Sequence, residues 1–531
     1  MGVTEPPSPP GPPAAASGTQ AGASQGDPAG TPPGAKDYIS ILSGTSQNIA
    51  GIVIAALATF AANILLTRTL GPEGFGVVTV LTQAAFVGSF ATRSGMDMAV
   101  LRDVAVEVGV GRFGGIRAPV GRAAAIAGAV SLVVAVVAIL AANAVRAVFS
   151  VSDDIGRWTV EAAAVGLPFL ALANVWLSAT RGLKIMRYTL YFFWAGQPVG
   201  WVILMLAGFR LSETAWMGAF TYSLSWAFAT VAAFLAWKRE SKSWPAEAMP
   251  PGALARLMRY AGPRAPAALF SQLLFWTDLF VLTRYATGAE VGIYSAALRA
   301  GQIIVLFLTS VSLMFSPFVA DLHNRGETER LDRLFKALTR WTIAATLPAL
   351  LLLIVAPGSA LRIFGSDFAG GQTALLILIV GQFINIATGS VGFVLIMVGR
   401  TGWDLVVYAA SLATNLALAF WLCPRYGMVG AALANAITFA LSKWARLILV
   451  STFVHIQPYD RDYLRLLVPS TVGLAVMWLV HGAIGSERYL VDLLATGALG
   501  TLAYGIVYAT VSLTPAERRG LAGVRARLAS R

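Results

Sequence analysis

The chain has 531 residues, of which 57% are hydrophobic and 12% are charged, and its formal net charge is +13. A soluble protein carries roughly 25% charged residues, so the composition excludes an ordinary soluble protein and indicates a membrane protein. Basic loops held on the cytoplasmic side explain the positive charge better than nucleic-acid binding does. A single cysteine, Cys423, excludes a disulfide framework and a thiolate metal site, and the three scattered histidines predict no metal ligand pair.

The two ends of the chain predict tails rather than packed structure. Residues 1–37 are rich in Pro, Gly, Ala and Ser and show no apolar periodicity, so they cannot bury enough surface to offset their ordering entropy. They also lack the basic and apolar regions of a signal peptide. We expect a disordered cytoplasmic tail here and a basic cytoplasmic tail over 514–531.

Between the tails the sequence repeats apolar segments joined by short loops. A transmembrane helix needs about 20 apolar residues to cross ~30 Å of hydrocarbon. The pattern therefore predicts an all-α polytopic membrane protein of about fourteen transmembrane helices. The predicted segments are 46–67, 77–98, 119–145, 158–180, 188–209, 213–237, 262–283, 291–319, 341–356, 372–398, 403–423, 429–452, 464–482 and 489–512.

Lys and Arg fall mainly in alternate loops. With the N-terminus placed inside, the inside loops and tails hold 29 of these residues and the outside loops hold 8. Basic residues are retained on the cytoplasmic side of a membrane. The bias predicts a multi-pass protein with both termini in the cytoplasm.

An internal repeat divides the chain into halves. Leu66-Thr67-Arg68 ends the first segment and precedes a Gly-x-Glu turn at Gly71, while Leu282-Thr283-Arg284 ends the seventh and precedes a Gly-x-Glu turn at Gly288. Both turns face outside in the predicted topology. The repeat therefore has the same orientation in both halves and predicts a pseudo-two-fold axis along the membrane normal.

The repeat and the loops predict the following organisation. Two six-helix lobes over 38–237 and 262–452 are joined by a cytoplasmic linker over 238–261, and two additional transmembrane helices occupy 453–513. Before the ninth segment, Leu331, Leu334, Phe335 and Leu338 share one helical face. We expect a separate amphipathic connector there, lying at the membrane interface.

Several motifs follow one another in an order that is typical of one family of membrane transporters. The sequence Arg68-x-Leu-Gly-Pro-Glu-Gly-Phe-Gly is similar to the first outside turn of that family, and Gly95-x-x-x-Ala-x-x-Arg follows the second segment. Gly381-Gln-x-x-Asn, Gly399-Arg and Pro424-x-Tyr-Gly-x-x-Gly-Ala-Ala match patterns of the C-terminal half. In this order the motifs resemble the oligosaccharide flippase (polysaccharide transporter) family of the MOP superfamily of exporters, and the resemblance runs from about residue 38 to residue 512.

The resemblance implies two lobes around a central cavity and transport by alternating access. It also implies the cargo, a sugar repeat unit on undecaprenyl pyrophosphate that moves across the bacterial inner membrane for surface or exopolysaccharide biosynthesis. Membrane lipids, a polysaccharide polymerase and export machinery are the partners it implies. The two helices after the twelfth are similar to those of the lipid II flippase branch.

Ionisable residues inside spans cost roughly 2.5–3.5 kcal/mol each, so they are candidates for function. Arg93 and Asp97 lie four residues apart near the inner end of the second segment, and they are candidates for either substrate binding or a structural ion pair. Arg299 has no oppositely charged residue at helical spacing, which favours a role lining the cavity. Asp278 either pairs with Arg299 or takes up H⁺ or Na⁺, and the sequence leaves both open.

Amides inside spans form a second set of candidates for substrate binding. They either line a wet pathway or form hydrogen bonds between helices. The set is Asn63, Gln83, Gln272, Gln302 and Asn385.

Absent motifs narrow the function. The chain has no phosphate-binding loop of the Gly-x-x-x-x-Gly-Lys-Ser/Thr type and no His-Glu-x-x-His motif, and no loop is long enough for a catalytic domain. We therefore expect no enzyme activity and no cofactor, with coupling to H⁺ or Na⁺ left open. The predicted function is a flippase for lipid-linked oligosaccharide. The alternatives are a lipid II flippase, an ion-coupled drug antiporter, and a membrane-embedded glycan polymerase or ligase.

Overall fold

The computed structural model describes residues 35–245 and 247–513. In these ranges all regular secondary structure is helical. The predicted tail over 514–531 and most of the tail over 1–37 lie outside the described residues. The last three residues of the predicted N-terminal tail begin the first helix.

The first half of the described chain contains seven α-helices and one π-helical segment. They are α1 (Ala35–Thr92), α2 (Met96–Gly109), α3 (Arg117–Leu140), α4 (Ala142–Val148), α5 (Asp153–Gly182), η1 (Thr189–Gly196), α6 (Gln197–Gly208) and α7 (Ala215–Glu240). We call this group the N-terminal lobe.

The second half begins at α8, after an irregular connection. Its elements are α8 (Ala253–Leu282), α9 (Gly288–Gln302), η2 (Ile303–Val305), α10 (Leu306–Asn324), α11 (Thr328–Val355), α12 (Pro357–Arg362), η3 (Ser366–Gly371), α13 (Gln372–Ala387), α14 (Val391–Met397) and α15 (Thr401–Phe453). We call this group the C-terminal lobe. The chain then continues through η4 (Arg461–Leu466), α16 (Leu467–Ile484), η5 (Ser486–Arg488), α17 (Tyr489–Val507) and η6 (Tyr508–Ser512).

The helices are long and apolar enough to confirm the predicted all-α membrane fold. Within the described residues, 11 helical stretches have the length and hydropathy of a membrane span. Two of them contain a sharp bend, at Gly71 (φ 66°) in α1 and at Gly427 (φ 53°) in α15, so each covers two predicted segments. The count of fourteen spans stays a prediction.

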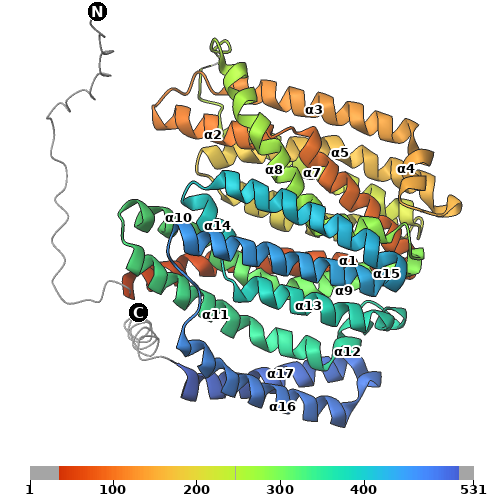
Figure 1. Ribbon diagram of the computed structural model, residues 1–531. Coiled ribbons are helices and arrows are strands. Elements are labelled where there is room, and N and C mark those ends of the chain that lie inside the picture. The colour runs from red at the N-terminus through yellow and green to blue at the C-terminus, as the bar shows by residue number, and fades with distance from the viewer. Residues whose placement is uncertain (1–34, 246, 514–531) are drawn as a thin grey trace, which may run out of the picture.

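The long helices lie side by side across the molecule (Figure 1). The bends of α1 and α15 lie at one end, together with α12, and we call this the Gly71 end. The turn between α1 and α2 lies at the other end, which we call the Gly95 end. The pair α16 and α17 forms one edge of the molecule beside α11, and α3 lies at the opposite edge (Figure 1).

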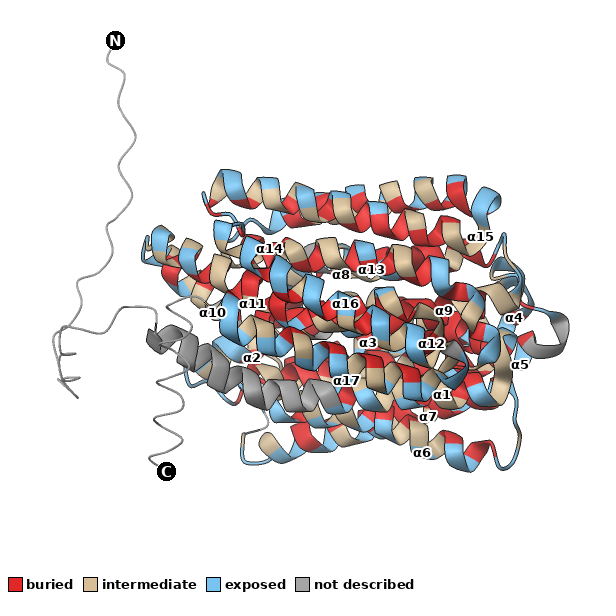
Figure 2. Cartoon of the chain, turned by 90° about the horizontal axis from the view of Figure 1, so that it is seen from below, coloured by how far each residue is buried: buried red, intermediate tan, exposed pale blue. Residues whose placement is uncertain are grey.

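Burial follows the faces of the helices, with buried positions facing neighbouring helices and exposed positions facing outwards (Figure 2). Many exposed positions are large and apolar, including Leu132, Val133 and Val137 of α3 and Trp478 and Leu479 of α16. Soluble proteins rarely expose continuous apolar surfaces of this kind. These faces therefore fit a surrounding of lipid.

The amphipathic segment at 330–341 does not form the separate interfacial connector that we expected. It is the first part of α11, which continues without a break to Val355. Leu331, Leu334 and Phe335 are buried, and the Phe335 ring stacks on Phe315 of α10. The apolar face is therefore used for packing inside the protein rather than for contact with lipid headgroups.

The last two long helices pack against α11 through buried polar contacts. The hydroxyl of Tyr504 donates a hydrogen bond to the carbonyl oxygen of Ala344 at 2.9 Å, and Arg340 donates to the carbonyl oxygen of Ser512 at 2.5 Å. Hydrogen bonds inside a membrane protein replace those that water would supply. The two C-terminal helices are thus attached to the C-terminal lobe.

Candidate functional site

The two repeated turns meet at the Gly71 end, where the second leg of α1 packs against α9. A Cβ atom added at Gly76 would lie 2.7 Å from the carbonyl oxygen of Gly288, and one added at Gly292 would lie 1.8 Å from the carbonyl oxygen of Pro72. Only glycine permits backbones to approach this closely. The two turns of the sequence repeat therefore contact each other directly and join the lobes.

Arg68 adds a second contact between the lobes at the same end. Its Nη2 donates to the carbonyl oxygens of Arg362 and Ile363 at 3.0 and 2.9 Å, and its Nε donates to Ile363 at 3.1 Å. Nη2 also donates to the hydroxyl of Tyr489 at 2.9 Å. The rings of Phe75 and Phe368 pack edge to face nearby. Together these contacts join the two lobes at the Gly71 end.

The lobes also touch at the Gly95 end, through α2 and α8. A Cβ atom at Gly95 would lie 2.6 Å from the carbonyl oxygen of Ala261. Arg256 of α8 lies 3.9 Å from both Asp103 and Glu107 of α2. Burial raises the pKa of Asp103, and the charge of Arg256 opposes that shift. Since the charged groups at this contact are partly exposed, they are screened by solvent.

Arg299 lies between the lobes with few partners. It belongs to α9, its guanidinium group lies 5.0 Å from the centre of the Trp276 ring, and Tyr222 of α7 is near enough to interact with its charge. Its Nε atom is buried and has no hydrogen-bond partner in the described part of the chain. A half-buried arginine with unused donors can bind an anion that enters between the lobes.

Asp278 does not pair with Arg299. The carboxyl group of Asp278 is fully buried, accepts a hydrogen bond from the hydroxyl of Tyr294, and lies beside Asn435 of α15. Its other oxygen, Oδ1, has no hydrogen-bond partner among the described residues. Of the two roles that the sequence left open, the ion pair with Arg299 is therefore not formed among the described residues.

Arg93 and Asp97 form an ion pair with a distance of 3.4 Å between Nε and Oδ2. The pair spans the turn between α1 and α2, and the Arg93 guanidinium lies 3.7 Å from the centre of the Phe90 ring. Its Nη1 atom is buried without a partner in the described structure. Arg181 of α5 lies close enough for its positive charge to repel that of Arg93. Two arginines and one carboxylate therefore share this site at the Gly95 end.

The candidate amides divide into two groups. Asn63 donates to the carbonyl oxygen of Thr59 at 2.6 Å, and Asn385 donates to Gln382 at 3.1 Å, so both are buried and bonded within their own helices. The other three are partly exposed and make no side-chain hydrogen bond within the described residues. They are Gln83 of α1, Gln272 of α8 and Gln302 of α9.

Sequence reasoning missed several residues near these groups. Arg181 and Arg446 count among the 29 basic residues of the inside loops and tails and were not candidate site residues. Arg446 is in fact buried and lies 2.9 Å from Asp404 within α15. Tyr222 and Trp276 were missed because aromatic residues are common in membrane helices, and only tertiary packing places them around Arg299.

Comparisons with known proteins agree with this architecture. Residues 41–323 match the polysaccharide biosynthesis protein family, and residues 263–421 match the MatE family. Two relatives from Haloferax volcanii are the probable low-salt glycan biosynthesis flippase Agl15 and the probable flippase AglR. The first is 25% identical over 202 residues, covering 38% of this chain and 43% of the relative. The second is 25% identical over 174 residues, covering 31% and 36%.

The chain thus matches less than half of the length of each of these curated relatives. Both relatives are named as probable flippases, which agrees with the prediction of a non-enzymatic transporter.

Solved structures of transporters have a similar fold. An inward-facing MATE family multidrug transporter of the MOP superfamily has a TM-score of 0.64 at 12% identity, covering 75% of this chain and 94% of that one. The lipid II flippase MurJ in an inward closed conformation has a TM-score of 0.63 at 15% identity, covering 86% and 98%. At these identities the similarity concerns the fold alone. Because the family match spans more than half of the chain, the protein belongs to the polysaccharide biosynthesis protein family.

Proposed function

We propose that the protein is a flippase that moves oligosaccharide repeat units linked to undecaprenyl pyrophosphate across the bacterial inner membrane, for surface or exopolysaccharide biosynthesis. The observation that carries this proposal is the guanidinium group of Arg299, which lies between the lobes with a buried donor and no ion-pair partner among the described residues. The curated relatives named as flippases support the same reading.

The chemistry of the cargo explains why an arginine suits this position. A pyrophosphate is strongly anionic, and a guanidinium group stays charged and binds phosphate oxygens through two parallel hydrogen bonds. An unpaired arginine facing lipid would be costly. Between two lobes it is accessible to an anion whenever one end opens.

Alternating access requires contacts that can separate without unfolding either lobe. The contacts at the Gly71 end suit this role, because they consist of backbone approach at Gly76 and Gly292 and of hydrogen bonds from the exposed Arg68. In the proposed cycle, cargo enters from the Gly95 end, and the Gly71 end then opens to release it.

We further propose that transport is coupled to H⁺ or Na⁺ through Asp278. Its buried carboxyl group has one oxygen without a partner in the described structure, and the hydroxyl of Tyr294 and the side chain of Asn435 lie beside it. Hard cations prefer oxygen ligands of this kind. Occupation by a cation would neutralise the carboxylate and change packing among α8, α9 and α15.

The proposed location is the bacterial inner membrane, with both termini and the Gly95 end in the cytoplasm. The distribution of Lys and Arg supports this orientation. The proposed partners are the lipid-linked oligosaccharide, membrane lipids, and a polysaccharide polymerase with its export machinery.

A reconstituted flipping assay tests the function. The purified full chain would be placed in liposomes with a fluorescent sugar on undecaprenyl pyrophosphate, and a membrane-impermeant reagent would report the exposed fraction over time. Faster exposure than in protein-free liposomes is expected. Exposure at the protein-free rate, while a drug cation or lipid II is transported, would instead support one of the alternatives.

A further inference from the structure

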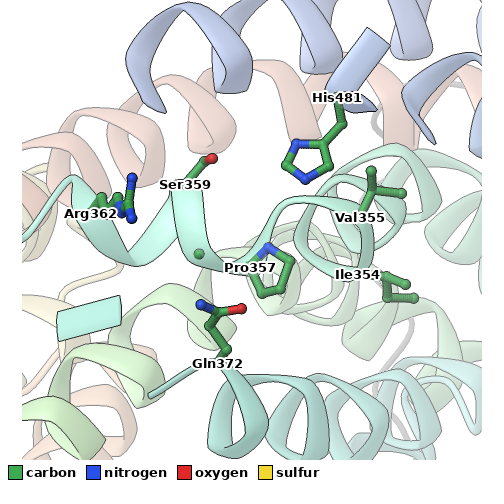
Figure 3. Close-up of a pocket in the computed structure, with 8 residues that line it drawn as sticks. Ile354, Val355, Pro357, Ser359, Arg362, Gln372 and His481 are labelled. Carbon is green, nitrogen blue, oxygen red and sulfur yellow. The ribbon is translucent and has the colours of Figure 1, made fainter. Parts of the chain in front are cut away.

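A polar pocket lies at the Gly71 end of the C-terminal lobe, where α12 and the start of α13 meet the end of α16 (Figure 3). Its volume is about 260 Å³. The polar part of its lining consists of Ser359, Arg362, Gln372 and His481. The backbone carbonyl of Arg362 accepts a hydrogen bond from Arg68, but the side chains that line the pocket lie apart from the group around Arg299.

A buried carboxylate binds two of the residues that line this pocket. Asp492 of α17 is 0% exposed and accepts hydrogen bonds from the hydroxyls of Ser359 and Thr496. His481 Nδ1 lies 2.9 Å from each of its two carboxylate oxygens. A buried carboxylate needs such donors. Because Nδ1 is bound to Asp492, the opposite nitrogen of the ring, Nε2, faces the pocket (Figure 3).

The other walls supply a cation and an amide. Arg362 comes from α12 and Gln372 from the first turn of α13 (Figure 3). A Cβ atom at Gly358 would lie 3.0 Å from Gln372 Nε2, so the glycine leaves room for the amide. Gln372 is exposed, and Arg362 and His481 are partly exposed. A ligand can therefore reach all three side chains.

We infer that this pocket binds the phosphate group of a membrane lipid. Arg362 and Gln372 donate hydrogen bonds from two sides, and His481 Nε2 donates from a third side when the ring is protonated. Arg362 and His481 are the ionisable residues of the lining, and Asp492, which binds His481, is not part of the lining. A tetrahedral oxyanion matches donors that converge from three directions.

The position and size of the pocket point to a lipid headgroup. The volume of the pocket is slightly below the range of about 300–1,000 Å³ that is typical of pockets for drug-sized ligands. Ile354, which also lines it, is 42% exposed, and Trp478 and Leu479 on α16 are 69% and 64% exposed. Exposed tryptophans gather at the level of lipid headgroups. Acyl chains can therefore extend along this apolar surface while the phosphate occupies the pocket.

Two lipids share this chemistry, a phospholipid of the bilayer and a polyprenyl phosphate. The test uses the purified full chain in a phosphate-free detergent, with binding followed by native mass spectrometry. The probes are phosphatidylglycerol, undecaprenyl phosphate, and a diacylglycerol that has the same acyl chains but no phosphate. Tighter binding of phosphatidylglycerol identifies a bilayer lipid as the ligand, and tighter binding of undecaprenyl phosphate identifies the carrier lipid.

Variants distinguish binding in the pocket from a general attraction of anionic lipids to basic residues. We expect Gln372→Leu to weaken binding of the preferred phosphate lipid severalfold, and Arg362→Gln combined with Gln372→Leu to weaken it at least tenfold. Arg284→Gln removes an exposed arginine from the same end, outside the pocket lining, and should leave binding unchanged. Because Gln372 is exposed, its single variant should keep the fold, and thermal unfolding would check this.

Two results would overturn the inference. One is binding of the diacylglycerol as tightly as of both phosphate lipids. The other is unchanged binding of the phosphate lipids by the folded Gln372→Leu variant and by the double variant.

Discussion

Arg68 of the N-terminal lobe donates two hydrogen bonds to the carbonyl oxygen of Ile363 in the C-terminal lobe, 295 residues further along the chain. This relationship joins the outside turn of the repeat to the segment that follows α12. Hydrogen bonds from a side chain to backbone carbonyl oxygens can break and form again without any change in covalent structure. We therefore expect this contact to act as a reversible clamp between the lobes.

Arg68→Ala should shift the protein towards a conformation that is open at the Gly71 end. Each hydrogen bond contributes roughly 0.5–1.5 kcal/mol, and a loss of about 1.4 kcal/mol changes an equilibrium tenfold. Spin labels on cysteines that replace the exposed Glu213 and Asp367 would report the distance between lobes. We expect a larger population at long distance, with Arg284→Ala as the control. An unchanged distribution would mean that Arg68 does not hold the lobes together.

Gly292→Ala should prevent closure of the Gly71 end. The added methyl group would lie 1.8 Å from the Pro72 carbonyl oxygen, so the lobes must separate. Gly301→Ala is a matched control in the same helix, because its methyl group meets its nearest neighbour at 3.8 Å. Transport should fall at least tenfold in the first variant and stay near normal in the second. Equal activity of the two would show that close approach of α1 and α9 is not needed for the cycle.

Arg299→Ala should abolish glycan export and leave the amount of protein in the membrane near normal. Arg299→Lys should restore export only partly, because an ammonium group lacks the planar fork that binds phosphate through two hydrogen bonds. Export would be measured as surface polysaccharide in cells that lack the native gene, with membrane abundance measured by immunoblot. Normal export by the alanine variant, or its disappearance from the membrane, would assign Arg299 a peripheral or a structural role.

Asp278→Asn should remove the dependence of transport on an ion gradient. The amide has nearly the same size as the carboxyl group but cannot take up a proton or balance the charge of Na⁺. Flipping in liposomes with an imposed pH or Na⁺ gradient should become insensitive to that gradient, while Tyr294→Phe should keep a reduced response. A full response in the Asn variant would place the coupling group elsewhere.

Cysteine labelling should place the Gly71 end outside and the Gly95 end inside. Suitable exposed positions are Ser152 and Ser366 at the Gly71 end and Lys242 and Arg325 at the Gly95 end. Lys242 is a better reporter than its neighbour Ser241, which is buried. An impermeant maleimide applied to intact cells should label the first two only. Labelling of the second pair instead would reverse the predicted orientation.

The sequence by itself determined those features that depend on local pattern. The hydropathy of successive segments predicted the helices of a membrane protein, since a span must satisfy its own backbone. The spacing of Arg93 and Asp97 indicated an ion pair as one of two possible roles, and the pair forms across the turn between α1 and α2. The Leu-Thr-Arg repeat indicated equivalent turns in the two halves, and these turns do meet.

Tertiary structure alone decided which distant groups came together. Asp278 accepts a hydrogen bond from Tyr294 and does not pair with Arg299. The start of α11 packs inside the protein. Asp492, which binds His481, also accepts a hydrogen bond from Ser359 of α12. Each contact depends on how the faces of different helices fit, and many faces of a membrane helix have nearly the same hydropathy. Local patterns of polarity can therefore locate the spans, but only packing selects the neighbours of each side chain.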